Sequence, residues 1–329
     1  MDDVSAGSVR VSRGVDREVT SRRALPSLLA ALALWAGCSL EKPDPAAQAA
    51  GILHKHPADF IDQLSALETV VLKEIGARSG PTALTESLYA YRSRLQPLMA
   101  AAGHDSEKAA ILNAWVFDTL KVEPIMDARE LETSLPGRVL ETRRGSCVGL
   151  SLLFLALGET LQLPIYPVFL PGHVFVRYRA PGYRRNFETL RRGLARSDSF
   201  YLATFTLEKR PWYGLREREP RQVLAALVFN LGNTHREGRK RSAALAEFRL
   251  VEELLPGFPE ALGNQGALHL EAGNRPMAKQ CLLAALAGDS LAAPAWRNLV
   301  TIYRAEGDTA GETWALGRLH RLAEGSPGP

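Results

Sequence analysis

Apolar residues recur three and four positions apart through much of the chain, which is the spacing of one helix face. Before residue 121 this spacing covers three stretches, residues 57–76, 82–101 and 106–120. Residues 148–161 are apolar on several faces, which predicts a helix that is buried on all sides. After Pro164 the residues alternate as in a strand, and a turn at 180–182 separates it from a second strand at 186–190. The pattern therefore predicts an α+β domain over residues 55–215.

The last third of the chain repeats itself with a period of 34 residues. Three frames superimpose, residues 225–258, 259–292 and 293–326. Ala244 and Ala278 occupy one helix-packing offset, where the third frame has Glu312. The pattern resembles the tetratricopeptide repeat, which implies an all-α array over residues 222–325 and a groove that binds a partner protein or peptide. The alternative is that these helices only cap the preceding domain.

Composition and charge narrow the class of protein. The 329 residues are 46% hydrophobic and 23% charged, which is typical of a folded protein and excludes a disordered or multi-span membrane chain. The formal net charge is only +4 and no dense basic stretch contains interleaved aromatic residues, so we predict no nucleic-acid partner. The sequence has neither a phosphate-binding glycine loop nor a clear cluster of metal ligands. We therefore predict no cofactor and no metal.

The N-terminal segment is typical of an export signal. Two arginines precede the uncharged residues 24–37, and these fourteen residues would span about 21 Å as a helix, less than the bilayer core of about 30 Å. Two small residues directly before Cys38 resemble the bacterial lipobox. The resemblance implies that residues 1–37 are removed and that Cys38 carries a lipid, which anchors the protein in the bacterial cell envelope. Residues 38–54 are rich in proline and alanine and are predicted to form a tether. The alternative is a buried helix that ends in a structural cysteine.

The three cysteines, Cys38, Cys147 and Cys281, are too few and too widely spaced for a disulfide framework or a four-cysteine zinc site. Cys147 follows a Gly-Ser turn at the start of the predicted buried helix. The unpaired N–H groups and the helix dipole favour a negative charge there, so a thiolate at this position suits a nucleophile. Cys281 lies beside two leucines inside a repeat helix, and we expect it to be a packed structural thiol.

The predicted strands bring a histidine and a carboxylate together. If the hairpin turn is centred between Ala180 and Pro181, His173 lies directly opposite Glu188, with Cβ atoms about 5 Å apart. A carboxylate at that distance can fix the tautomer of the imidazole while the other ring nitrogen faces the thiol. Asn186 lies two residues earlier on the same strand face and is the alternative partner of His173.

Three segments carry a resemblance to a known family: VLETRRGSCVGLSLLFLALGETLQLPI, PGHVFVRY and NFETL. The resemblance that rests on these segments covers about residues 106–205 and is to the transglutaminase-like superfamily. The resemblance implies a papain-like thiol fold with a Cys-His-Asp triad in that chain order. Carried over, Cys147 is the nucleophile, His173 the general base and acid, and Glu188 the orienting residue in place of Asp.

The resemblance implies an enzyme that attacks amide bonds of a protein or peptide substrate through an acyl-enzyme, with hydrolysis favoured over crosslinking. An oxyanion hole could use the Cys147 backbone N–H, but the sequence identifies no second donor. The alternative is an inactive transglutaminase-like and tetratricopeptide scaffold that binds partner proteins at the envelope.

Overall fold

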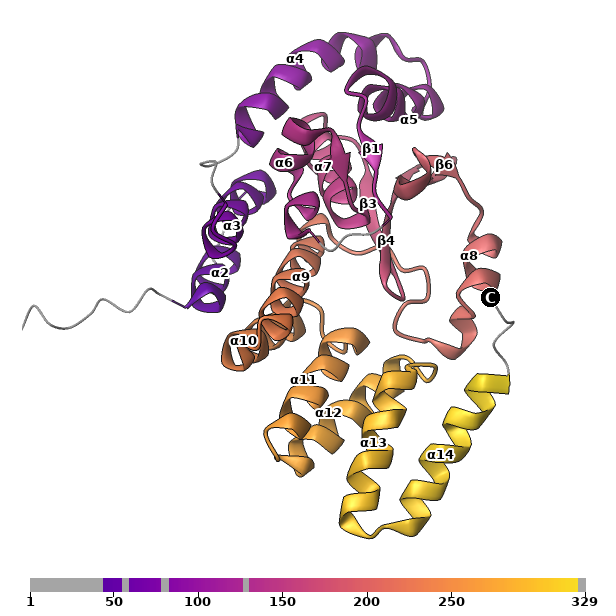
Figure 1. The fold of residues 1–329 in the computed structure, drawn as a ribbon. Helices are drawn as coiled ribbons and strands as arrows, with labels where there is room; N and C mark the ends of the chain where they lie inside the picture. Colours follow the sequence, from indigo (N-terminus) through magenta and orange to yellow (C-terminus); the bar gives the residue numbers. More distant parts are fainter. Residues whose placement is uncertain (1–43, 55–58, 78–82, 127–129, 325–329) are drawn as a thin grey trace, which may run out of the picture. The chain divides into compact units, whose positions relative to one another are not determined.

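The computed structural model describes residues 44–54, 59–77, 83–126 and 130–324 (Figure 1). The predicted signal segment 1–37 and the predicted lipid attachment site Cys38 lie outside these ranges. From Asp44 onward the chain forms one compact unit. Among the helices in the described ranges, none combines the length and the apolar character that crossing a membrane requires.

The first described part of the chain is helical. It contains α2 (Pro45–Leu53), α3 (Phe60–Glu74), α4 (Leu84–Ala101) and α5 (Asp105–Ala114), the last of which continues into a π-helical turn at Trp115–Thr119. The predicted helices at 57–76, 82–101 and 106–120 correspond to α3, α4 and α5 with its π-helical turn. The apolar spacing of the sequence therefore located these elements correctly.

The prediction of a tether at residues 38–54 is wrong for its second half, which forms α2. The Asp44 side chain accepts a hydrogen bond from the Ala46 N–H at 3.1 Å and caps the helix. Pro45 stands at the first helical position, where its missing N–H removes no helical hydrogen bond. Alanine is the best helix former, and one face of α2 is buried through Ala46, Ala49 and Leu53. The proline and alanine residues of this segment therefore belong to a helix that is capped and packed, and not to a tether.

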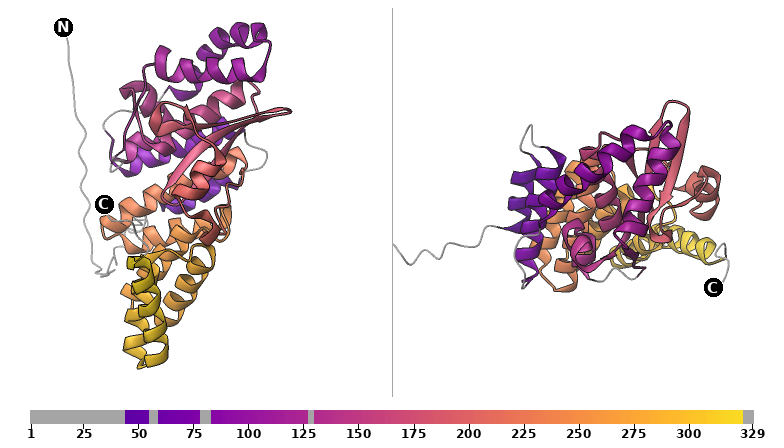
Figure 2. Two further views of the ribbon diagram at one scale, coloured as in Figure 1. Left: turned by 90° about the vertical axis from the view of Figure 1, so that its right-hand side faces the viewer. Right: turned by 90° about the horizontal axis from the view of Figure 1, so that it is seen from above.

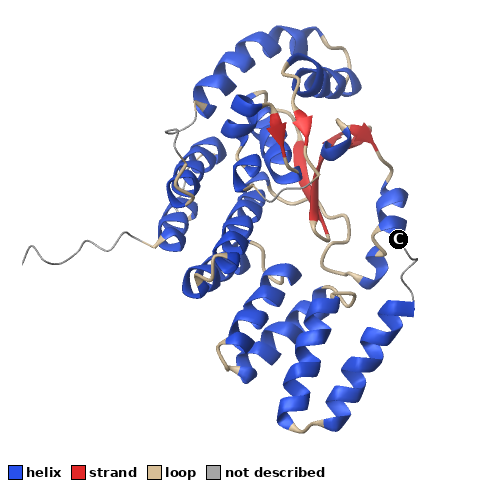
Figure 3. Ribbon diagram, viewed as in Figure 1, coloured by secondary structure: helices blue, strands red, loops and turns tan. Residues whose placement is uncertain are grey.

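A four-stranded antiparallel sheet lies at the centre of the α+β region (Figure 3). Its strands follow the order of the sequence: β3 (Ile165–Leu170), β4 (His173–Ala180), β5 (Tyr183–Glu188) and β6 (Leu194–Ala195). Before this sheet, β1 (Glu123–Pro124) pairs in parallel with β2 (Arg144–Gly145), and a 3₁₀ turn at Leu131–Ser134 and the helix α6 (Pro136–Thr142) lie between these two short strands.

The helices α7 (Cys147–Thr160) and α8 (Asp198–Thr204) cover opposite faces of the sheet. The Phe154 ring of α7 lies 5.5 Å from Phe187 on one face. The Tyr201 ring of α8 stacks on Phe175 at 4.4 Å on the other. Almost every residue of α7 is buried, which confirms the prediction of a helix enclosed on all sides. This packing places the start of α7 beside the end of the sheet at which β4 begins.

Three helix pairs form the C-terminal part (Figure 2). They are α9 (Leu224–Glu237) with α10 (Arg241–Leu254), α11 (Pro259–Glu271) with α12 (Arg275–Gly288), and α13 (Ala293–Glu306) with α14 (Thr309–Glu324). Each 34-residue frame of the sequence holds one pair. A Cβ on Gly232 would lie 2.7 Å from Phe248, and one on Gly266 would lie 2.7 Å from Leu282, so glycine permits the close approach within the first two pairs. The predicted period is confirmed, and the region is a helical-repeat-like run.

The segments that follow α10 and α12 pack directly on the α+β region. Phe169 of β3 lies 6.0 Å from Phe258, and the Trp212 indole N–H donates to the Pro256 carbonyl at 2.9 Å. Arg210 forms an ion pair with Asp289 at 2.7 Å. One continuous apolar core extends from Ala49 to Ala261. The predicted boundary between residues 215 and 222 therefore lies inside a shared core.

Candidate active site

Cys147 is the first residue of α7, and the preceding segment holds it in place. The Ser146 backbone N–H donates to the Thr133 carbonyl at 2.9 Å. The Ser146 hydroxyl accepts the Gly149 N–H at 3.3 Å, so Ser146 caps the helix. The Cys147 side chain is half-buried and carries a free thiol. The prediction of a thiol at the start of a buried helix is confirmed.

Gly149 allows the first turn of α7 to lie against the 3₁₀ turn at residues 131–134. A Cβ at this position would collide with the backbone carbonyl of Thr133, which cannot rotate away. We expect Gly149→Ala to displace the start of α7, to cost about 1–3 kcal/mol of stability, and to slow alkylation of Cys147. Urea unfolding and the iodoacetamide rate measure the two effects.

Gly158→Ala is the matched control, because it lies in the same helix. The atoms nearest to its Cβ would belong to the flexible side chain of Ile165, the first at 3.1 Å. We expect a smaller loss of stability and an unchanged alkylation rate in this control. An unchanged stability and rate in Gly149→Ala would contradict the role given to Gly149.

His173 begins β4 directly after a tight turn. Gly172 has a φ of +64°, which favours glycine, and its N–H donates to the Glu260 carboxylate of α11 at 3.1 Å. The His173 Nε2 atom lies 2.9 Å from Glu188 Oε1 and 3.1 Å from Oε2. Since Nε2 faces the carboxylate, Nδ1 is the ring nitrogen left to face the thiol, and the interaction with Cys147 is among the causes that raise the pKa of His173. Cys147 and His173 line one cavity, and Glu188 hydrogen-bonds His173.

The hairpin register differs from the predicted one. Ala180 pairs with Tyr183, so Pro181 and Gly182 form the turn and the pairing is displaced by two residues. In this register Glu188 continues the strand opposite Phe175, and His173 is its diagonal neighbour. Because side chains alternate between the two faces with a period of two, a displacement by two keeps both side chains on the same face. The predicted contact is therefore correct, although the predicted direct pairing is wrong.

Asn186 is not the partner of His173. Its Oδ1 accepts the Arg177 Nε–H at 2.7 Å, and its Nδ2 donates to Asp198 at 2.9 Å. Through these two hydrogen bonds the Asn186 amide connects β5 with β4 and with the start of α8. The alternative triad with Asn186 is therefore wrong, because this side chain is engaged in a neighbouring buried ion-pair network.

Tyr201 completes the site, and sequence reasoning missed it. Its hydroxyl donates to Glu188 Oε2 at 3.1 Å, and the Leu190 N–H donates to Glu188 Oε1 at 3.3 Å. The Tyr201 side chain is fully buried against Phe175. Glu188 thus receives hydrogen bonds from His173, a tyrosine and a backbone amide. No motif in the sequence pointed to Tyr201, which lies one helix beyond the strand pair.

The neighbours of His173 determine whether its imidazole is charged. Burial alone would lower the pKa of His173, but hydrogen bonds and charge interactions with Cys147 and Glu188 raise it to about 9. Burial raises the pKa of Glu188, and the bonds from His173 and Tyr201 outweigh this effect, so its pKa lies below the usual value. At neutral pH the site therefore holds an imidazolium next to an ionised carboxylate.

The thiol faces a cavity that the repeats help to form. This cavity has a volume of about 180 Å³ and is lined by Cys147 and His173 on one side and by Phe229 and Asn230 of α9 on the other. The Asn230 amide donates to the Ser134 hydroxyl at 3.1 Å, and Ser134 shares a hydrogen bond of 3.0 Å with Ser146. A repeat helix is thereby joined to the residue that caps the cysteine helix. Sequence reasoning missed Asn230.

A second cavity, of about 460 Å³, lies on the other side of His173. It is lined by His173, Glu188 and Tyr201 together with two arginines, Arg191 and Arg196. Within the described residues, no group of three or more His, Cys, Asp or Glu side chains is arranged to hold a metal ion. Cys281 is buried in α12, and burial raises the pKa of its thiol.

A comparison with protein families matches part of the chain. Residues 82–198 match the family model of the transglutaminase-like superfamily. All three residues Cys147, His173 and Glu188 lie inside the matched range, whereas Tyr201, Asn230 and Glu260 lie outside it. A search of curated proteins gives no match to the chain. The chain therefore carries a transglutaminase-like core at residues 82–198, and a run of paired helices at residues 220–324 follows it.

Proposed function

We propose that the protein is a thiol-dependent acyl transferase or hydrolase that acts on peptide amide bonds. The observation that carries this proposal is the arrangement of Cys147, His173 and Glu188: the thiol and the imidazole line one cavity, and the imidazole hydrogen-bonds a carboxylate that also accepts from Tyr201. A nucleophile, a proton carrier and an orienting group in hydrogen-bond reach of one another are the parts that covalent amide chemistry requires.

The reaction proceeds in two steps. The Cys147 sulfur attacks the carbonyl carbon of the amide, a carbon–sulfur bond forms, and the carbon–nitrogen bond breaks as His173 gives its proton to the leaving amine. A thioester on Cys147 remains. The neutral imidazole then takes a proton from the acyl acceptor, which attacks the thioester carbon and restores the sulfur as the leaving group. Glu188 keeps the imidazole oriented throughout and stabilises its charged form.

We propose that water is the acyl acceptor. The cavity on the Glu188 side of His173 is lined by Arg191 and Arg196. Their positive charges oppose the approach of a protonated amine, such as a lysine side chain, whereas they do not affect neutral water. We therefore propose hydrolysis of peptide amides as the main reaction, with transamidation as the minor one.

Location and partner binding belong to the same proposal. The signal-like residues 1–37 and Cys38 support a lipid-anchored protein of a bacterial envelope. The 34-residue period and the helix pairs support a tetratricopeptide-type array that contacts a protein. A scaffold without catalysis is the competing function, and thiol reactivity separates the two.

Alkylation of the chain with Cys38→Ser tests the proposal, because only Cys147 and Cys281 then remain. We expect iodoacetamide to label Cys147 at least ten-fold faster than Cys281 at pH 6.5, as followed by mass spectrometry, because an imidazolium adjoins only the first thiol. The same protein should hydrolyse members of a peptide library, and Cys147→Ala should not. Equal labelling of the two cysteines, or negligible labelling of Cys147, favours the scaffold.

A further inference from the structure

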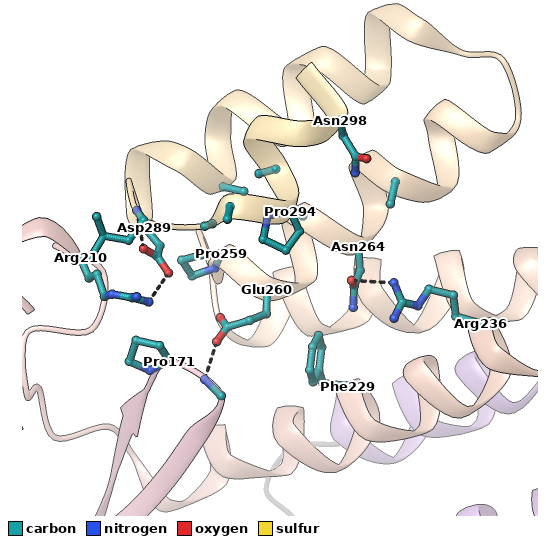
Figure 4. A pocket seen from close by; sticks show the side chains of 18 residues that line it. Pro171, Arg210, Phe229, Arg236, Pro259, Glu260, Asn264, Asp289, Pro294 and Asn298 are labelled. Carbon is teal, nitrogen blue, oxygen red and sulfur yellow. Dashed lines mark hydrogen bonds and ion pairs between the residues drawn. The ribbon is translucent and has the colours of Figure 1, made fainter. Parts of the chain in front are cut away.

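A large cavity lies along the helix pairs next to the His173 turn (Figure 4). It has a volume of about 600 Å³. Pro171 and Gly172 of the β3–β4 turn form one end, and α9, α11 and α13, the first helices of the three pairs, form the wall. We call this cavity the repeat groove.

The repeat groove adjoins the cavity that contains the thiol. Gly172, Phe229 and Glu260 line both spaces. Gly172 directly precedes His173, and Glu260 accepts the Gly172 N–H at 3.1 Å. A ligand that lies in the groove therefore reaches the residues that flank the reactive pair.

One asparagine occurs at the same offset in each repeat frame. Asn230, Asn264 and Asn298 are separated by 34 residues each and are all half-buried. Asn230 lines the thiol cavity, whereas Asn264 and Asn298 point into the repeat groove from α11 and α13 (Figure 4). The Asn264 side chain is oriented by Arg236, which donates to its Oδ1 at 3.3 Å, and by Asn233, which accepts from its Nδ2 at 2.8 Å. A carboxamide carries both a donor and an acceptor, as a peptide unit does.

The charged side chains along the groove each have a polar partner. Arg210 is paired with Asp289 at 2.7 Å, Arg236 bonds to Asn264, and Glu260 bonds to the Gly172 N–H. The remaining wall is largely apolar and small, with Pro259, Pro294 and several alanines. The lining of the groove contains two arginines and two acidic side chains, so neither sign of charge predominates in number. The groove therefore suits the backbone of an extended segment with small, uncharged side chains.

We propose that the repeat groove and the thiol cavity form one binding site for an extended peptide, the substrate whose amide Cys147 attacks. The row Asn230, Asn264 and Asn298 binds the peptide backbone. Helices that pack together lie about 8–10 Å apart, so the row from α9 to α13 spans about 20 Å, or about six extended residues. This inference rests on the proposed function and adds the substrate class: an unfolded segment of at least six residues.

Peptide electrophiles of two lengths test the inference in the chain with Cys38→Ser. Alanine–serine peptides of two and ten residues carry a chloromethyl ketone at the C-terminus in one set and a chloroacetyl group at the N-terminus in the other. In both sets the sulfur displaces chloride and a carbon–sulfur bond forms. The two sets cover both directions in which a peptide can lie in the groove. Iodoacetamide reports the intrinsic reactivity of the thiol.

We expect the decapeptide of one set to inactivate Cys147 at least ten-fold faster than its dipeptide. Asn264→Ala combined with Asn298→Ala should remove this gain, so that the ratio of the decapeptide rate to the dipeptide rate falls to about one, each rate being normalised to that of iodoacetamide. Gln280→Ala is the matched control, because this carboxamide is exposed on α12 and does not line the groove. Equal rates for the two lengths in both sets would overturn the inference, as would a double variant that slows iodoacetamide equally.

The failure of the proposed function gives a different result. An inert Cys147 would react slowly with every probe, including iodoacetamide. Fluorescence anisotropy of an unreactive labelled decapeptide, measured with Cys147→Ala, then reports the groove alone. Binding that the double asparagine variant weakens at least five-fold would support the groove, and binding that it leaves unchanged would overturn the role of the asparagines.

Discussion

Replacing His173 with alanine is expected to lower the rate of peptide-amide hydrolysis by about 10²–10⁴-fold. The variant loses both the proton donor for the leaving amine and the base for the attacking water. It also loses the positive charge beside the sulfur, so alkylation of Cys147 should slow. Hydrolysis of a library-selected peptide and the rate of alkylation measure both effects.

The pH profile of the unaltered protein provides a second readout of the same residue. Because hydrogen bonds from His173 to Cys147 and Glu188 raise the pKa of the imidazole to about 9, the imidazolium persists through neutral pH. We expect hydrolysis to decline as the pH rises through about 9, since the proton for the leaving amine is then lost. A decline that begins near 6.5, the ordinary value for histidine, would contradict the contact between His173 and the two partners.

Tyr201→Phe is the matched control, because it removes one hydroxyl from the site and leaves His173 in place. The hydroxyl is one of three groups that donate to Glu188. Loss of one hydrogen bond is worth about 0.5–1.5 kcal/mol, so the rate should fall by about ten-fold or less. If Tyr201→Phe is as damaging as His173→Ala, Tyr201 takes part in the chemistry directly.

The sequence was sufficient to place the reactive trio because each signal was local. Cys147 follows a Gly-Ser turn at the start of an apolar run, and the first turn of such a helix is a fixed geometric feature. His173 and Glu188 lie on two strands joined by a turn of two residues. Side chains alternate between the two faces of a strand, so the error of two residues in the predicted register left His173 and Glu188 on the same face. An error of one residue would have placed them on opposite faces.

The rest of the site comes from contacts over long sequence distances. Tyr201 and Asn230 lie beyond the strands, and no spacing rule relates them to Cys147. Glu260 touches Gly172 across 88 residues. Their roles follow from the way that α8, α9 and α11 pack on the α+β region, which the pattern of a single element does not encode. The 34-residue period predicted the helix pairs. It did not predict that the first helices of these pairs line a cavity next to the one that contains the Cys147 thiol.

The wrong prediction of a tether at residues 38–54 also has its cause in contacts that the local sequence does not contain. Composition alone describes a flexible tether, because proline and alanine are common in linkers. The helix depends on the partners of its buried face. The Gln63 side chain of α3 donates to the Ile52 carbonyl at 3.1 Å, and Leu53 is fully buried in the core. A short alanine-rich segment becomes a helix when such packing is provided, since isolated helices of this length are marginal in water.

The second large effect is expected at a buried ion-pair cluster that joins α3 to the first helix pair. The His235 Nδ1 and Nε2 atoms lie 2.8 Å from Glu247 and 2.9 Å from Glu74, and Glu247 is fully buried. Burial alone would lower the pKa of His235, but these two carboxylates raise it. His235→Leu leaves the Glu247 carboxylate without its cationic partner, and we expect a loss of about 3–5 kcal/mol in urea unfolding at pH 7.5.

A double variant identifies the cause of this loss. Burial raises the pKa of Glu247 in the folded state, so this carboxyl contributes stability that is present below its unfolded value and is lost as the pH rises. The raised pKa of His235 acts in the same direction in the unaltered protein, so a comparison of two pH values combines both groups. The double variant His235→Leu/Glu247→Leu removes the uncompensated charge at one pH and should recover most of the stability at pH 7.5. No recovery in the double variant would mean that His235 stabilises the junction only through its packing.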